Sequence, residues 1–436
     1  MLLRSRIVLP MTAPPVEDGA VLICGEQVVA VGRWQDLRNA TTHGDVVIDL
    51  GERILLPGLV NAHCHLDYTH LAGHLPPPKR FTDWLQGVLG LKAGWSFSEY
   101  ADSWLAGAGQ LMRTGCSSVM DFEAVPELLP EVWLGTPLRV VSALEMTGVR
   151  SVRTPEQILE EALAHVARLT PMPEGKSVAL APHATYSTRP GLLRLSASAA
   201  RARGWPIACH VAESEDEFDM FLHARGPMYQ WLRSQRDMGD CGKGSPIRHV
   251  ADHGLLGEGA MLIHVNHLAE GDEGLIARAG SVVVHCPRSH DYFRHPPFPY
   301  RRLKDAGVAV ALGTDSLLSV RKGGEKLPRL NLLEEMRTFM GAHPWVSPQE
   351  VLEMVTVVGG RLVSPGLDLG CLREGAAADL MVVPYAGDVG AAAAGVVAHS
   401  GDVSGLMIGG RWVWCGDSEG RTVMGDRDSG PVVRAA

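Results

Sequence analysis

Residues 58–66 of the chain, GLVNAHCHL, form a short apolar run that ends in two histidines, His63 and His65, separated by one residue. Successive side chains of a β-strand point to opposite faces, so these two imidazoles share a face if the run is a strand. Two imidazoles on one face can supply two ligands to one metal ion, with Zn–N distances of about 2.0–2.1 Å. Two unrelated polar residues in a loop would give the same pattern. The preceding Pro57 and Gly58 favour the strand, as do further polar residues that end apolar runs downstream.

Length and composition limit the class of protein. The 436 residues exceed the roughly 250–300 at which a single core stops growing, so one large domain and a smaller one are expected. A hydrophobic content of 46% fits a soluble globular protein. No run approaches the ~18 apolar residues of a membrane span, and the N-terminus lacks a long apolar segment before a small-residue cleavage site. We therefore expect a cytoplasmic protein with no membrane partner.

Cysteine usage and charge argue against a protein built on disulfides or cysteine–zinc sites and against a nucleic-acid-binding protein. The eight cysteines occur singly, with no C-x-x-C pair, which argues against a disulfide framework and against a cysteine zinc site. The net charge is −9, and no cluster of Lys and Arg forms a stripe. Because phosphate neutralisation dominates nucleic-acid affinity, we expect no nucleic-acid partner. The composition leaves a homodimer open.

The two ends of the chain share a texture of short strands. Residues 7–50 contain RIVLP, GAVLICGEQVVAVGRW and DVVIDL, with glycines as turn signals, and the far end contains ADLMVVP (378–384) and GLMIGGRWVWC (405–415). The middle of the chain has a different character. We therefore expect residues 1–57 and 373–436 to build one small β-sandwich domain around a larger domain of residues 58–372.

Eight apolar, β-rich runs recur in this larger segment, at residues 58–65, 117–122, 138–145, 177–183, 206–213, 260–266, 281–287 and 308–315. Helix-start signals separate several of them: T-P-x-Q at residue 154, S-P-x-E at residue 347 and S-x-x-E at residue 96. Continuous apolar strands that alternate with helices indicate a parallel sheet. Eight such units close most simply as a (β/α)₈ TIM barrel, so the predicted fold class is α/β.

Polar residues gather at the ends of these runs. In a TIM barrel the chemistry lies at the C-terminal ends of the strands. Satisfied core histidines would be scattered with respect to strand position. The residues at these ends are His63, His65, His183, His210, His264 and Asp315.

Three imidazoles and one carboxylate suit Zn²⁺ or Fe²⁺, with one position left for water. The candidate ligands are His63, His65, His210 and Asp315. Bound Zn²⁺ can lower the pKa of water from 15.7 to about 7, which generates hydroxide. Glu213 follows His210 by three residues, a position for a proton carrier. His264 would hydrogen-bond the oxygen at the attacked carbon.

Several of these motifs together resemble the amidohydrolase superfamily. They are PGLVNAHCH, CHVAE, LIHVNHL, HCPRS, LGTDS and GAAADLMVV, and they cover nearly the whole chain. The similar branch contains cytosine, guanine and adenosylhomocysteine deaminases and the triazine hydrolases. The resemblance implies the four ligands above for one divalent metal ion, with Glu213 and His264 as catalytic groups beside Asp315. No lysine ends SVALAPH, which argues against the two-metal variants.

The resemblance also implies substrate contacts for His183, in APHATYS, and for Phe81 and Trp84, in FTDWL. His290 stands where relatives usually have asparagine, and the segment after TDS also departs from the family; both would lie near substrate side groups. The exact substrate therefore does not transfer.

Arg288, in HCPRS, is the last candidate for substrate binding. A guanidinium at the mouth of the barrel suits a carboxylate or phosphate. The alternative is a structural ion pair with an acid such as Asp291. If Arg288 binds substrate, the substrate carries an anionic group, as aminodeoxyfutalosine does and cytosine does not.

The function that these expectations favour is hydrolytic deamination of an amino-substituted heteroaromatic ring through a metal-bound hydroxide. Glu213 would protonate a ring nitrogen, and Asp315 would pass a proton to the departing amine, so that ammonia leaves. The same site could open a cyclic amide or displace chloride, as a triazine chlorohydrolase does. A non-catalytic scaffold would be expected to have lost one of the site residues. Nucleobases, pterins and adenine nucleosides such as aminodeoxyfutalosine all remain open as substrates.

Overall fold

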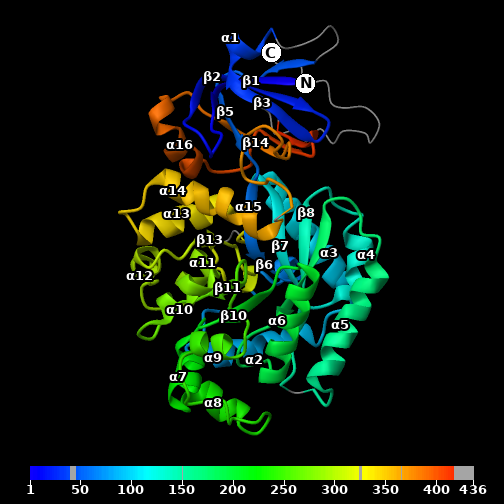
Figure 1. Ribbon diagram of the computed structural model, residues 1–436, viewed down its shortest axis with the longest axis vertical. Helices are drawn as coiled ribbons and strands as arrows, with labels where there is room; N and C mark the ends of the chain where they lie inside the picture. The colour runs from blue at the N-terminus through cyan, green and yellow to red at the C-terminus, as the bar shows by residue number, and fades with distance from the viewer. Residues whose placement is uncertain (40–45, 150, 324–326, 365, 417–436) are drawn as a thin grey trace.

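The computed structural model describes residues 1–416, apart from residues 40–45, 150, 324–326 and 365. A sheet built from both chain ends lies at one end of the long axis, and a larger α/β unit lies below it (Figure 1). Within the described ranges, no helix is both long and apolar enough to cross a bilayer.

The eight strands expected for the barrel are all present and pair in parallel. They are β6 (Leu59–Cys64), β7 (Cys116–Glu123), β8 (Arg139–Met146), β9 (Lys176–Pro182), β10 (Ala208–Val211), β11 (Met261–His264), β12 (Val282–His285) and β13 (Val310–Leu312). They form two four-stranded sheets, β6 to β9 and β10 to β13. Parallel bridges Leu180–Ile207 and Cys64–Asp315 join the two sheets at both seams. The predicted barrel is thus confirmed.

The inside of the barrel is packed with small and medium apolar side chains, which is why the strands appear in the sequence as nearly continuous apolar runs. Each strand contributes at least one member to a buried cluster, among them Val60, Met120, Val141, Ala179, Ala208, Met261, Val284 and Ala311. A filled interior leaves the ends of the strands as the place for a site.

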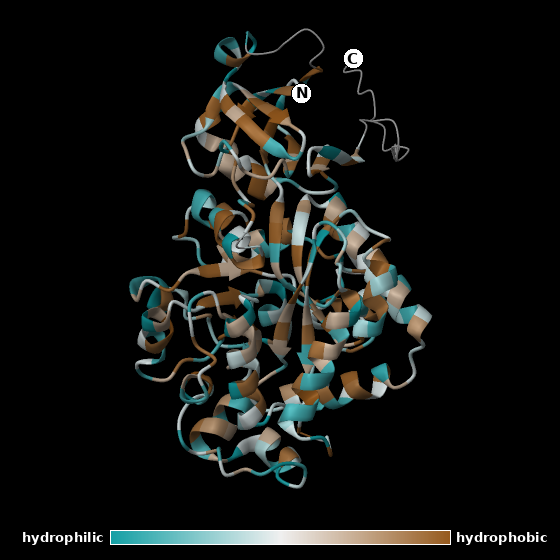
Figure 2. Cartoon of the chain, turned by 45° about the vertical axis from the view of Figure 1, so that its right-hand side comes forward, coloured by the Kyte–Doolittle hydropathy of each residue, from teal (hydrophilic) through white to brown (hydrophobic). Residues whose placement is uncertain are grey.

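Helices surround the barrel, and along them polar and apolar residues alternate (Figure 2). They are α2 (Phe81–Lys92), α3 (Phe97–Arg113), α4 (Leu129–Val132), α5 (Pro155–Leu169), α6 (Pro190–Arg203), α7 (Glu215–His223), α8 (Gly226–Leu232), α9 (Pro246–Asp252), α10 (Asp272–Ala279), α11 (Pro287–Phe293), α12 (Tyr300–Asp305), α13 (Leu332–Ala342), α14 (Pro348–Met354) and α15 (Val357–Val363). The capping boxes expected before α3 and α5 are formed. Before α14 only half of the box forms: Ser347 caps the helix, whereas the Glu350 carboxylate binds Tyr300 and Lys304.

Strands from both chain ends form one mixed sheet in the order β16-β15-β14-β5-β1-β2-β3, with β4 beside β1. They are β1 (Leu2–Val8), β2 (Val16–Cys24), β3 (Gln27–Arg33), β4 (Val47–Asp49), β5 (Arg53–Pro57), β14 (Leu380–Pro384), β15 (Gly405–Ile408) and β16 (Arg411–Cys415). The antiparallel pair β5–β14 unites the two ends, as expected. The last twenty residues of the predicted C-terminal segment, 417–436, lie outside the described residues.

The junction between sheet and barrel is close-packed. A Cβ atom at Gly58, between β5 and β6, would lie 2.5 Å from Ser117 Oγ, so glycine is required there. A buried bidentate ion pair, with N–O distances of 2.7 and 3.0 Å, joins Arg139 of β8 to Asp379 beside β14. These contacts fix the position of β6, and hence the position of His63.

Candidate active site

A cavity of about 210 Å³ opens at the C-terminal ends of the barrel strands. Its inner end is polar and includes His65, His210, Glu213, His264 and Asp315. Its outer wall is mainly apolar and comes from α2, α8 and neighbouring loops. The structure therefore brings together, at one end of one cavity, residues that lie up to 250 positions apart in the chain.

The first and last barrel strands bring His63 and His65 against Asp315. Asp315 Oδ1 lies 3.5 Å from His63 Nε2 and 3.8 Å from His65 Nε2. Gly313 allows this approach, because a Cβ atom there would lie 2.7 Å from the His63 carbonyl oxygen. That carbonyl accepts hydrogen bonds from the backbone N–H groups of Thr314, at 2.9 Å, and Asp315, at 3.2 Å.

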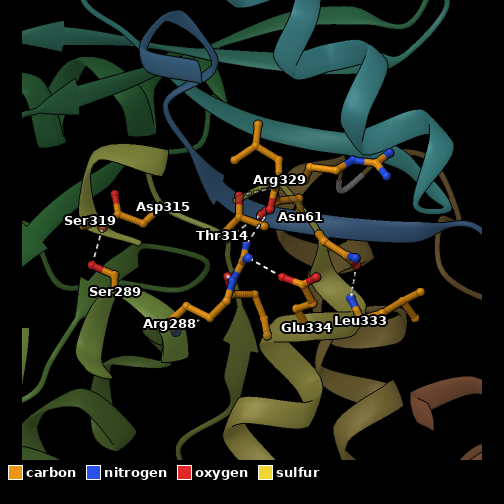
Figure 3. A network of polar contacts seen from close by, with 12 residues as sticks. Asn61, Arg288, Ser289, Thr314, Asp315, Ser319, Arg329, Leu333 and Glu334 are labelled. Carbon is orange, nitrogen blue, oxygen red and sulfur yellow. Dashed lines mark hydrogen bonds and ion pairs between the residues drawn. The ribbon is translucent and has the colours of Figure 1, made fainter. Parts of the chain in front are cut away.

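Asn61 strengthens the same seam and was not foreseen from the sequence. Its amide donates to the Thr314 hydroxyl at 2.8 Å, and its side-chain oxygen accepts from the Thr314 N–H at 3.1 Å (Figure 3). Asn61 thus clamps the loop that carries Asp315 to the strand that carries His63.

Overlapping groups of donor atoms at the inner end of the cavity could hold a metal ion. Ligand atoms of His63, His65 and Asp315 lie within 4.8 Å of one another, and so do those of His63, His210 and His264. His63 Nε2 is buried and has no hydrogen-bond partner among the described residues, which an uncoordinated imidazole seldom tolerates. Such a set of imidazoles and a carboxylate suits Zn²⁺ or Fe²⁺.

Neighbouring groups prepare His210 and His65 to act as ligands. The Nδ1–H group of His210 donates to the His183 carbonyl oxygen at 2.6 Å, which leaves Nε2 free for the cavity. Burial lowers the pKa of His65 to about 3 and that of His210 well below its usual value. Both imidazoles are therefore neutral, as a metal ligand must be.

Asp315 is held as a carboxylate. Burial alone would raise its pKa, but the surrounding imidazoles of His63, His264 and His65 outweigh burial and lower it well below its usual value. Its second oxygen accepts hydrogen bonds from the hydroxyl groups of Ser289, at 2.6 Å, and Ser319, at 3.0 Å (Figure 3). Asp315 has a φ of 52°, a left-handed conformation that costs energy and is typical of functional sites.

Glu213 has the opposite protonation state. Burial raises the pKa of Glu213 well above its usual value, and the charges of Asp315 and Glu217 raise it further. Its Oε1 lies 3.4 Å from His264 Nε2, and burial lowers the pKa of His264 to about 3. A protonated acid therefore lies beside a neutral imidazole and an ionised carboxylate. Two carboxyl groups with separated pKa values are the pattern of an acid–base pair.

Glu217 positions the loop that carries Glu213. Its carboxylate accepts hydrogen bonds from the N–H groups of Ala212, at 2.9 Å, and Glu213, at 2.8 Å, and from the Thr185 hydroxyl. The sequence offered a signal, because Ser214 and Glu217 have the spacing of a capping box. The carboxylate instead binds the loop before the N-cap, which the spacing could not show.

Asn266 holds the other side of that loop and also contacts His290, which was expected near substrate side groups. The Asn266 amide donates to the Glu213 carbonyl at 2.9 Å and its side-chain oxygen accepts from His290 Nδ1 at 3.0 Å. His290 therefore contacts Asn266 and is not among the residues that line the cavity, where a substrate group would lie. Its partner lies on another strand, so sequence neighbours could not identify it.

The outer wall contains the aromatic residues that the resemblance implied. Phe81 and Trp84 of α2 line the cavity, with ring centroids 5.7 Å apart. His183 lines it too, and its Nδ1 lies 2.6 Å from the Ser187 hydroxyl. Glu145, which also lines the cavity, was not foreseen.

Arg288 is not among the residues that line the cavity, which favours the structural alternative over substrate binding. Its Nε and one terminal nitrogen donate to the carboxylates of Glu335 and Glu334, each at 2.5 Å, and the other terminal nitrogen donates to the Arg329 carbonyl at 3.0 Å (Figure 3). These acids lie on α13, whereas Asp291 is 3.8 Å from Arg321. A strand-end position identified the edge of the barrel correctly but not the direction of a long side chain.

Fold and site together define a metal-dependent hydrolase of the TIM-barrel type. A family model described as the amidohydrolase family matches residues 54–413. The chain belongs to the amidohydrolase family.

Two curated relatives are each 29% identical to this chain. One is a 5-methylthioadenosine/S-adenosylhomocysteine deaminase from Halobacterium salinarum, with 85% of this chain and 81% of the relative covered. The other is an aminodeoxyfutalosine deaminase from Deinococcus radiodurans, with 80% and 82% covered.

Solved structures show the same fold at lower identity. The aminofutalosine deaminase of Helicobacter pylori, in complex with methylthio-coformycin, has a TM-score of 0.81 at 22% identity and covers 94% of this chain and 99% of its own. The atrazine chlorohydrolase of Arthrobacter aurescens, complexed with zinc, has a TM-score of 0.80 at 23% identity, with 98% and 97% covered.

Proposed function

We propose that the chain is a hydrolytic deaminase of an amino-substituted heteroaromatic ring, with an adenine nucleoside as the substrate type. One observation carries the proposal: Glu213 and His264 lie against Asp315 beside a cluster of buried imidazoles, where the pKa of Glu213 is raised well above its usual value by burial and that of Asp315 lies well below. The two curated relatives, whose names give them as adenosine-type deaminases, support the substrate type.

The ligands proposed for a single divalent ion, Zn²⁺ or Fe²⁺, are His63, His65, His210 and Asp315. When bound, such an ion supplies a water molecule whose pKa is lowered toward neutrality. The remaining steps are performed by side chains of the protein. Its ligands leave Glu213 and His264 at the same end of the cavity, with free access to a substrate ring.

Glu213 donates its proton to the ring nitrogen next to the carbon that bears the amine, which makes that carbon electrophilic. The neutral His264 hydrogen-bonds the oxygen that adds to the carbon as charge develops there. Asp315 accepts a proton from the attacking water and passes it to the amine. The C–N bond then breaks, its electron pair stays with nitrogen and ammonia leaves. The remaining hydroxyl proton passes to the Glu213 carboxylate, and the ring keeps an oxo group in place of the amine.

Glu213 also separates deamination from the alternatives. A ring nitrogen must be protonated before an imine-like carbon is attacked, whereas an amide carbonyl needs this less. Opening of a cyclic amide would leave the raised pKa of Glu213 without a clear use. Deamination is therefore the reaction that uses Glu213, His264 and Asp315 together.

Ammonia release across a panel of amino-heterocycles tests the proposal. The metal-loaded enzyme is incubated with adenosine, 5′-methylthioadenosine, S-adenosylhomocysteine, aminodeoxyfutalosine, cytosine, guanine and a pterin. We expect release from at least one adenine nucleoside, and none from protein stripped of metal. Release of chloride from a chlorotriazine without ammonia from any amine would overturn it.

A further inference from the structure

The outer wall of the active-site cavity contains two charged side chains in otherwise mainly apolar surroundings. Glu145 lies near the C-terminal end of β8, and Lys92 is the last residue of α2. Both line the cavity that Glu213 and Asp315 close at its inner end. The proposed chemistry uses neither of them, so they are candidates for recognising the rest of the substrate.

The Glu145 carboxylate has no hydrogen-bond donor or ion-pair partner in the described part of the chain, and its side chain is half-buried. Other carboxylates around the site are satisfied: Asp315 accepts from two serine hydroxyls, and Glu217 from two backbone N–H groups and a threonine. A partly buried carboxylate that lacks protein donors gains from a hydrogen-bond donor in the cavity. Glu145 is therefore an acceptor that a ligand in the cavity can satisfy.

Glu145 is ionised in the structure. Burial would raise its pKa, but the neighbouring His183 and Lys92 outweigh burial and leave the pKa below its usual value. Lys92 is engaged elsewhere: its ammonium group donates to the Tyr68 hydroxyl and lies 4.8 Å from the centre of the Tyr68 ring. Among the described residues, the outer wall thus contains a carboxylate, Glu145, that can accept hydrogen bonds, and an ammonium group, Lys92, that already has a partner.

Because Arg288 lies outside the cavity, it adds no positive charge to the outer wall. Among the described residues that line the cavity, Lys92 is the only lysine or arginine. An anionic substituent would lie near the Glu145 carboxylate and would find no guanidinium among the described residues of the cavity wall. A substituent that donates hydrogen bonds would satisfy the carboxylate instead.

We propose that Glu145 is a specificity-determining residue, which accepts hydrogen bonds from a donor group of the substrate and disfavours substrates with an anionic group at that place. This inference rests on the proposed deaminase function and narrows its substrate class to neutral, donor-bearing amino-heterocycles. The donors can be sugar hydroxyl groups or ring N–H groups, which share the chemistry that a carboxylate recognises.

Two matched substrate pairs test the inference in the metal-loaded enzyme. Adenosine and 2′,3′-dideoxyadenosine differ in sugar donors, and adenosine 5′-carboxamide and 5′-carboxylate differ in charge at nearly constant shape. A hydrogen bond to a charged group contributes about 1.5–3 kcal/mol, so we expect kcat/KM to favour the donor-bearing member by roughly ten- to over a hundredfold. We expect the carboxamide to be favoured over the carboxylate. Guanine, which offers ring N–H donors without a sugar, distinguishes the two sources.

In the variant Glu145→Gln, the ratio of kcat/KM for the carboxamide to that for the carboxylate should fall close to one. The ratio for adenosine to 2′,3′-dideoxyadenosine should also fall, and the metal content should stay unchanged. Glu160→Gln, an exposed position on α5, is the matched control and should keep both preferences. If only guanine loses kcat/KM in Glu145→Gln, ring N–H groups are the donors, and the inference stands. Glu145→Ser, whose smaller side chain cannot accept in the same place, replaces Glu145→Gln if that variant does not fold.

Two results overturn the inference while leaving deamination intact. One is a Glu145→Gln enzyme with both preferences unchanged. The other is a wild-type preference for the carboxylate that disappears in Lys92→Met, which would make Lys92 the recognition group. Failure of the proposed function itself is a separate outcome, in which the wild-type enzyme with metal bound releases no ammonia from any member of the panel.

Discussion

The inner end and the outer wall of the cavity are built in different ways. The inner side chains follow strand ends and are fixed by short-range hydrogen bonds, such as those from Ser289 and Ser319 to Asp315. The outer side chains come from α2, α8 and loops, and Glu145 has no fixed partner in the described residues. The fold as a whole therefore positions the catalytic groups of the inner end. The substrate preference, by contrast, depends on a few side chains of the outer wall and can be changed by a few substitutions.

The largest effect is expected at the inner end. Asp315→Ala removes the only carboxylate among the proposed ligands, so bound metal should fall from about one ion per chain and deamination should be lost. Metal analysis of the purified protein and an ammonia assay measure both. Asp291→Ala removes an exposed carboxylate on nearby α11 and should change neither. Two ions per chain at full activity would contradict the single-metal site.

Glu213→Gln should separate proton transfer from metal binding. The amide keeps the size of the side chain but cannot donate the proton, so kcat should fall by about 10² to 10⁴ with metal content retained. Glu215→Gln, two residues further on and exposed, is the control. Loss of metal in Glu213→Gln would make Glu213 a ligand. Unchanged turnover would favour amide or halide hydrolysis.

Arg288→Met tests whether Arg288 stabilises the fold or binds substrate. The Arg288 side chain is 9% exposed and its partner Glu335 is fully buried, so removing the guanidinium leaves a buried carboxylate unpaired. The free energy of unfolding should fall by about 3–5 kcal/mol, whereas kcat/KM should stay the same for neutral and acidic substrates. Denaturant unfolding and steady-state kinetics measure the two quantities.

Replacing both partners, in Arg288→Met with Glu335→Leu, should recover most of the stability, because no charge is then left buried. Arg321→Met is the exposed control. A selective loss of kcat/KM for acidic substrates at normal stability would return Arg288 to substrate binding.

The sequence predicted the barrel because its strands are buried on both faces and appear as apolar runs. It also predicted which residues would meet at the inner end, because parallel strands place their ends at one edge. His63 and Asp315, far apart in the chain, lie 3.5 Å apart for this reason. The spacing could not show where long side chains turn. Arg288 and His290 also follow a strand end, yet they bind Glu335 and Asn266 behind the cavity.

The smallest expected effect concerns Glu217, which supports the inner end without lining the cavity. Burial raises the pKa of Glu217 to about 7 from an ordinary value of 4.5, although hydrogen bonds from Thr185, Ala212, Glu213 and Ser214 oppose this. A carboxyl group whose pKa is higher in the folded than in the unfolded state binds its proton more tightly when folded. Its contribution to stability is complete below about pH 4.5 and is lost as the pH rises through about 7.

In the metal-loaded enzyme, thermal unfolding should therefore show a stability that falls between pH 5 and pH 8 more steeply in the wild type than in Glu217→Gln, which cannot titrate. The difference should not exceed about 3 kcal/mol, the equivalent of the pKa shift. Glu215→Gln, exposed on the first turn of α7, should keep the wild-type slope. Parallel slopes in wild type and Glu217→Gln would mean that Glu217 is ionised throughout this range. In that case the carboxylate would hold the Ala212 and Glu213 N–H groups as a permanent anion, and the pKa of Glu213 would owe more to its charge.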